Sequence, residues 1–106
     1  MSKETENKIP LLITFPLSEE LINRIKEVSP RLEIIHHPVK SYEDISEEVW
    51  NKAEILITEK ILPPAELAKQ LKWIQFNYAG IDFALKQDVL KMDNLLVTTL
   101  SGAAAP

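Results

Sequence analysis

Short apolar runs alternate with helical stripes along most of the chain, and this alternation limits what the chain can fold into. The first run, residues 9–15, is apolar at nearly every position and is followed by Pro16. Strands that are apolar on both faces are typical of parallel sheets covered by helices. A helical stripe then runs to Val28, with Ser18 as its expected N-cap. Pro30 ends this helix, because the residue before a proline avoids the α region.

The same pattern repeats to the end of the chain. Further strands are predicted at residues 32–36, 53–58, 73–76 and 95–99, with a loop at 42–44. Further helices are predicted at residues 46–50, 63–71 and 82–92. Strands that alternate with helices predict an α/β fold, here a flavodoxin-like three-layer sandwich with a mostly parallel five-stranded sheet. Because crossovers are right-handed, few topologies remain, and we expect the strand order 2-1-3-4-5.

The 106 residues fit one domain with one modest core. Residues 1–8 are polar and mixed in charge, and we expect them to form a disordered lead. Residues 9–102 would form the α/β domain. Residues 103–106 are small and end in proline, which is typical of a connection that enters a new helix. We therefore expect them to begin a crossover into a further domain, from which this chain has been cut.

Composition argues against several classes of protein. The chain has no cysteine, which excludes a disulfide framework, a thiolate metal site and a cysteine nucleophile. Its net charge is -4, and its Lys and Arg residues are scattered among acidic ones, so we expect no nucleic-acid partner. No apolar run approaches the roughly 20 residues that span a bilayer, so no membrane partner is expected. The polar start does not resemble a signal peptide, and we expect a cytoplasmic protein.

Ligands of an open α/β sheet bind outside the carboxyl ends of its strands. The most informative segment at that edge is FNYAGID, residues 76–82. Gly80 permits a positive φ, and the amides of Ala79, Gly80 and Ile81 would lie near the positive end of the next helix. Such a turn can hold a small carboxylate. A strand-to-helix turn that binds nothing is the alternative, and these residues alone leave it open.

This segment also carries a resemblance to a known family. Residues 71–82, LKWIQFNYAGID, resemble the stretch L-K-W-I-Q-x-x-x-A-G-V-D in the N-terminal catalytic (substrate-side) domain of D-isomer-specific 2-hydroxyacid dehydrogenases. Residues 97–102, VTTLSG, are similar to that family's V-T-N-x-x-G, with Thr99 where the family often has Asn. The resemblance extends over the chain from about Leu11. Residues 103–105 are three alanines in place of a more typical V-H/N-A, a departure that bears on subgroup and substrate.

The resemblance implies an oxidoreductase that interconverts a small 2-keto acid and a D-2-hydroxy acid with NAD or NADP. It implies that the backbone amides of Ala79, Gly80 and Ile81 hold the substrate carboxylate and that Tyr78 faces the same cleft. The family's catalytic Arg, Glu and His lie in or after the cofactor domain, so no catalytic residue is expected here. The cofactor would bind a missing C-terminal nucleotide-binding domain. The fragment alone would be inactive, and the full-length enzyme would be a homodimer.

Other polar residues near this edge are weaker candidates. Lys60 follows the third predicted strand and can attract an anionic substrate, although a solvated charge pair with Glu59 is the alternative. His36 and His37 would point to opposite faces of a strand and lack a third ligand. We therefore expect them to form a surface strand end and expect no metal site. The acidic residues in 43–48 are expected to form a solvated helix face.

A free-standing flavodoxin-like module that binds a small anion or signals is the alternative function. A phospho-acceptor receiver needs acidic residues after the first strand and an Asp after the third. This chain has Phe15-Pro16 and Thr58-Glu59 at those positions, which excludes a receiver. A module that binds small anions remains open.

Overall fold

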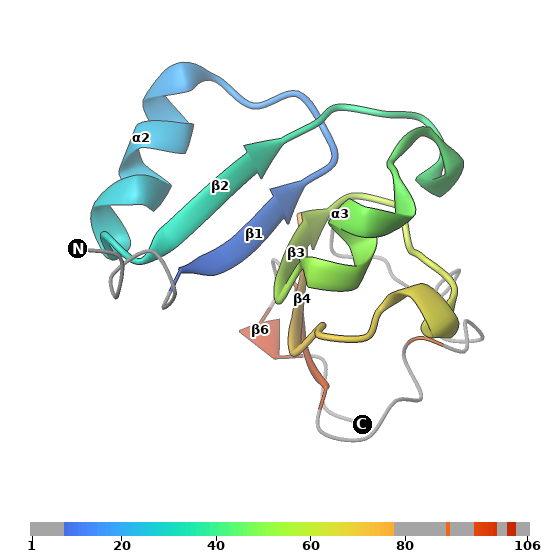
Figure 1. Cartoon of the computed structure of the whole chain (residues 1–106). Coiled ribbons are helices and arrows are strands. Elements are labelled where there is room, and N and C mark those ends of the chain that lie inside the picture. The colour runs from blue at the N-terminus through green and yellow to red at the C-terminus, as the bar shows by residue number, and fades with distance from the viewer. Residues whose placement is uncertain (1–7, 78–88, 90–94, 100–101, 104–106) are drawn as a thin grey trace.

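The computed structural model describes residues 8–77, 89, 95–99 and 102–103 of the chain. These residues form a six-stranded sheet with the order β2-β1-β3-β4-β5-β6 (Figure 1). The strands are β1 (Ile9–Ile13), β2 (Leu32–His36), β3 (Ile55–Thr58), β4 (Trp73–Phe76), β5 (Leu96–Thr99) and β6 (Gly102–Ala103). Neighbours from β2 to β5 run parallel, and β6 pairs antiparallel with β5. The predicted parallel sheet of order 2-1-3-4-5 is confirmed, and β6 extends it by an edge strand that the sequence analysis did not predict.

Two α-helices lie among the described residues, and both are capped by a serine as predicted. Helix α2 (Glu19–Val28) is capped by Ser18, whose hydroxyl accepts a hydrogen bond from the Leu21 amide at 3.3 Å. Helix α3 (Glu47–Lys52) is capped in the same way by Ser46. The predicted loop at 42–44 contains a short 3-10 turn, η1 (Tyr42–Asp44), capped by the Ser41 side chain. No helix within the described ranges is long and apolar enough to cross a membrane.

The predicted helix at residues 63–71 is wrong. Only a single 3-10 turn forms there, η2 (Ala65–Leu67), and Pro64 at its start offers no side-chain cap. Ala68 leaves the helical region with φ -89° and ψ 56°. Ala68 and Leu71 are nevertheless buried, at 1% and 6% exposure, so an irregular segment places these apolar residues in the core. The predicted helix at 82–92 lies outside the described residues, apart from Val89.

The core has two parts, one on each face of the sheet. On the α3 side a large cluster contains Leu12, Ile45, Trp50, Ala53, Leu56, Ala68, Leu71, Ile74, Phe76 and Val89. On the α2 side a smaller cluster contains Leu11, Ile13 and Phe15. Successive side chains of a strand point to opposite faces, so the apolar run of β1 supplies both clusters. Helices α2 and α3 lie on opposite sides of the sheet in Figure 1, which gives the predicted three layers.

The parallel register brings the carboxyl ends of the central strands to one edge. Ile13 at the end of β1 pairs with His36 on one side and with Ile57 on the other. Thr58 at the end of β3 pairs with Phe76 at the end of β4. The segments that follow β1, β2, β3 and β4 therefore emerge close together, where an open α/β sheet binds its ligands.

Candidate functional site

A hydrogen-bonded pair of threonine side chains lies at this carboxyl edge. The Thr14 hydroxyl donates to the Thr58 hydroxyl at 2.6 Å, and both residues are at most 1% exposed. The Thr58 oxygen also accepts the Ile61 amide hydrogen at 3.0 Å. These bonds satisfy two buried hydroxyl groups and fix both ends of the turn that carries Glu59 and Lys60.

Lys60 therefore lies on an anchored turn at the predicted edge, and its side chain is exposed. The next strand is tied to the same position, because the Asn77 amide donates to the Thr58 carbonyl at 2.8 Å. Asn77 is the residue directly before Tyr78. The described residues thus bring Lys60 and Asn77 to one edge of the sheet. Tyr78, Ala79, Gly80 and Ile81 themselves lie outside the described residues.

His36 links the end of β2 to the segment after β1. Its Nε2 atom is 3.0 Å from the Phe15 carbonyl oxygen and 3.2 Å from the Leu17 nitrogen. A ring with a bare Nε2 accepts the Leu17 amide hydrogen, whereas a ring protonated there donates to Phe15. His37 is exposed, as predicted, but His36 is half-buried and holds a neighbouring segment. His36 is the last residue of β2, so the predicted strand end is confirmed, and its ring is half-buried against the segment after β1.

A chain of side-chain hydrogen bonds fixes the end of β4 on the α2 face. The Trp73 indole donates to the Thr98 hydroxyl at 2.8 Å, and that hydroxyl donates to the Gln75 side-chain oxygen. The Gln75 amide group then donates to the Phe76 carbonyl at 3.1 Å. Trp73 and Gln75 are two positions apart and therefore share a face of the strand. This spacing is the only feature of the sequence that points to the hydrogen-bond network. The sequence analysis did not predict this hydrogen-bond network, because Thr98 belongs to another strand, β5.

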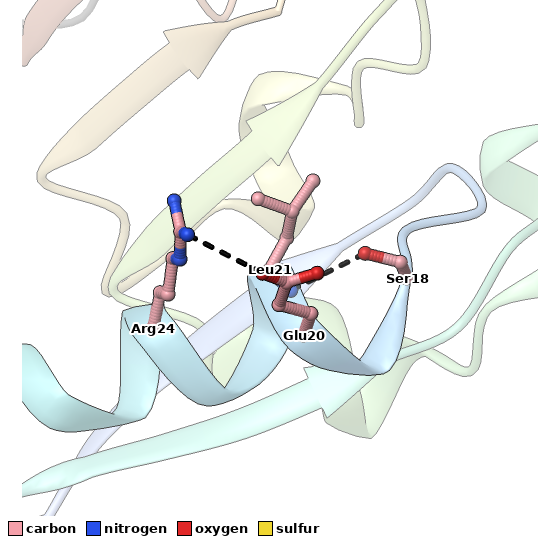
Figure 2. A network of polar contacts seen from close by, with 4 residues as sticks. All are labelled: Ser18, Glu20, Leu21 and Arg24. Atoms are coloured by element: carbon pink, nitrogen blue, oxygen red, sulfur yellow. Dashed lines mark hydrogen bonds and ion pairs between the residues drawn. The ribbon is translucent and has the colours of Figure 1, made fainter.

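A hollow of about 390 Å³ opens beside this edge, between α2 and the sheet. Its lining is mostly apolar: Phe15, Leu17, Leu21, Arg24, Ile25, Val28, Ile57 and Asn77. Figure 2 shows the helix wall, with Leu21 and Arg24 on the same side of α2. Arg24 is paired with Glu20 at 3.3 Å (Figure 2), and both side chains are more than two-thirds exposed, at 69% and 76%. Such a pair contributes little to stability, so Arg24 is available to a ligand at small cost.

The described residues were also compared with the side-chain groups that hold metal ions. No group of three His, Asp or Glu side chains within the described ranges converges on one point. The acidic residues Glu43, Asp44, Glu47 and Glu48 are distributed over η1 and the first turn of α3. Glu47 and Glu48 lie at the positive end of the α3 dipole, where carboxylates are stabilising.

Comparison with known proteins shows which fold the chain shares. No family model matches the chain, and no curated protein matches it. Two solved chains match its fold. One is the NAD+-bound 3-phosphoglycerate dehydrogenase of Entamoeba histolytica, with a TM-score of 0.68 and 18% sequence identity. The match covers 87% of this chain and 32% of that one, so this chain spans about a third of that dehydrogenase. The chain therefore shares the α/β fold of one part of an NAD+-binding dehydrogenase.

Proposed function

We propose that this chain is the substrate-side domain of an NAD- or NADP-dependent D-2-hydroxyacid dehydrogenase. The observation that carries the proposal is the position of residues 71–77, the described part of the LKWIQFNYAGID segment. Trp73–Phe76 form β4, and Asn77 lies at the carboxyl edge of a sheet whose fold is shared with a dehydrogenase. The resemblance in sequence and the likeness in fold thus support the same family from separate properties of the chain.

In this proposal the substrate carboxylate binds the backbone amides of Ala79, Gly80 and Ile81. Amide groups at the start of a helix are donors without internal partners, and the helix dipole favours an anion there. Tyr78 borders the bound acid and limits the size of its side chain. Lys60, on the anchored turn after β3, adds a positive charge to the same edge. These residues bind and orient the substrate and take no part in the chemical step.

The nicotinamide cofactor does not fit this chain. The chain has only two glycines, Gly80 and Gly102, and lacks the G-x-G-x-x-G turn that brings a backbone close to a pyrophosphate. We therefore propose that NAD or NADP binds a further, C-terminal nucleotide-binding domain of the complete protein. In the same proposal that domain supplies the catalytic groups, and the complete protein is a homodimer. A cytoplasmic location stays a prediction.

The test is an assay of the complete gene product with a panel of small 2-keto acids. We expect oxidation of NADH or NADPH and a product of D configuration. Gly80→Val, which crowds the carboxylate-binding amides, is expected to raise KM far more than it lowers kcat. Lys60→Gln is expected to raise KM by about 2- to 5-fold, as for one exposed charge pair, and Lys69→Gln in an exposed loop serves as its control.

The same assay separates the proposal from a small-anion-binding module. If the complete protein binds carboxylates but oxidises no reduced cofactor with any 2-keto acid, the dehydrogenase is wrong and the binding module stands. If it acts on 2-keto acids but Gly80→Val leaves KM unchanged, the enzyme class stands and the role proposed for Ala79, Gly80 and Ile81 is wrong.

A further inference from the structure

A second hollow lies at the opposite edge of the sheet, at the amino ends of β1, β3 and β4. Its volume is about 520 Å³, and the first residue of each of these strands lines it: Ile9, Ile55 and Trp73. It is therefore separated from the candidate substrate edge by the length of the strands. Neither the resemblance in sequence nor the likeness in fold assigns it a role.

The charge of this hollow is opposite to that of the chain. Lys8, Arg31 and Lys72 line it together with one carboxylate, Glu54, which gives a local charge of +2. The chain as a whole has a net charge of -4. Because basic residues are the minority in this sequence, their grouping around one concave surface is a specific feature, and it favours an anionic ligand.

Hydrogen bonds hold these charged residues beside the amino ends of the strands. The Ile9 amide donates to the Arg31 carbonyl at 2.8 Å, which holds Arg31 beside the start of β1. The Lys72 amide donates to the Glu54 carbonyl at 2.8 Å, and the two side chains approach to 3.6 Å. Lys8 is held to the same region by a 3.4 Å bond from its Nζ to the Pro30 carbonyl. Arg31 and Lys72 thus start from anchored backbone, and the Lys8 side chain is held near them, which lowers the entropic cost of gathering the three charges around a ligand.

The remaining wall of the hollow is aromatic and aliphatic. The Trp73 indole is oriented by its 2.8 Å bond to the Thr98 hydroxyl, and Trp73 and Ile55 are both half-buried. An oriented indole beside an aliphatic side chain offers a flat apolar surface. A ligand that uses the whole hollow therefore combines a dianionic group with a flat apolar body.

We propose that this hollow binds a phosphate monoester that carries a flat apolar group. The phosphate faces Lys8, Arg31 and Lys72, whose charge together with that of Glu54 matches a dianion. The flat group lies against Trp73 and Ile55. The site is independent of the proposed dehydrogenase function, because none of its lining residues is among the proposed substrate-binding residues.

The experiment is a titration of the ¹⁵N-labelled chain with phenyl phosphate, followed by NMR. Saturable shifts are expected for the Trp73 indole and for the amides of Arg31, Ile55 and Lys72. Inorganic phosphate is expected to bind more weakly, since it makes no contact with the apolar wall. Arg31→Gln and Lys72→Gln are each expected to weaken binding by about 2- to 5-fold, and higher salt weakens it further.

The matched control is Lys26→Gln, which removes one exposed charge from the last turn of α2. Its affinity for phenyl phosphate is expected to equal that of the unaltered chain. The proposal is overturned if the shifts do not saturate, if they centre on other residues, or if Lys26→Gln weakens binding as much as Arg31→Gln. It is also overturned if inorganic phosphate and phenyl phosphate bind equally. The function proposed for the opposite edge survives each of these outcomes.

Discussion

The hydroxyl oxygens of Thr14 and Thr58 lie 2.6 Å apart in a fully buried contact that joins β1 to β3 at the carboxyl edge. The Thr58 oxygen accepts a second hydrogen bond from the Ile61 amide, so one side chain connects the sheet to the turn that carries Lys60. This side chain makes the position of the turn depend on the packing of the sheet.

Replacement of Thr58 by Val keeps the shape of the side chain and removes both hydrogen bonds. The Ile61 amide and the Thr14 hydroxyl then lack their partner, and we expect a loss of about 1–3 kcal/mol in the free energy of unfolding. Urea denaturation measures this loss. The double variant Thr14→Val with Thr58→Val is expected to lose less than the sum of the two single variants. Strict additivity would show that the two hydroxyls do not interact.

Replacement of His36 by Ala is expected to release the segment after β1. With a bare Nε2 on His36, the Leu17 amide loses its side-chain partner, with a cost of about 1 kcal/mol. Hydrogen exchange of the Leu17 amide should accelerate. His37→Ala, which changes an exposed neighbour, is the control and should leave that exchange rate unchanged. Equal effects of the two substitutions would contradict the role assigned to His36.

Replacement of Ser18 by Ala removes the side-chain cap of α2 (Figure 2). The expected cost is about 1 kcal/mol of unfolding free energy, with fraying of the first turn that carries Leu21. Ser18→Asp is the matched variant, because a carboxylate both caps the helix and favours its positive end. Thermal or urea unfolding should rank the unaltered chain and Ser18→Asp together, above Ser18→Ala. A destabilised Ser18→Asp would show that the cap is not the source of the effect.

The order of the sheet could be predicted from the sequence because it depends on local patterns and on a general rule of handedness. Buried strands such as Ile9–Ile13 are continuous apolar runs, and serines mark the starts of α2 and α3. The helix predicted at residues 63–71 does not form, because burial of apolar residues and helix formation are separate properties. Ala68 and Leu71 carry the apolar spacing of a helix, yet they enter the core from an irregular chain.

The candidate site could be predicted only as an edge of the sheet. The sequence places Lys60 after one strand and Asn77 after another, and parallel pairing brings these ends together. The hydrogen bonds that shape the edge could not be predicted, because they join residues far apart in the chain. His36 contacts a segment 19–21 residues away, and Trp73 contacts Thr98 25 residues away. Such pairs follow from the register of the strands, which no local pattern reveals.

We expect the amides of residues 79–81 to bind a carboxylate. The most direct measurement is an NMR titration of the ¹⁵N-labelled chain with pyruvate, compared between the unaltered chain and Gly80→Val, with Gly102→Ala as the control. If these amides bind the carboxylate, saturable shifts at residues 77–82 are lost in Gly80→Val and retained in Gly102→Ala. Shifts that persist unchanged in Gly80→Val, or that never involve these amides, would contradict this expectation.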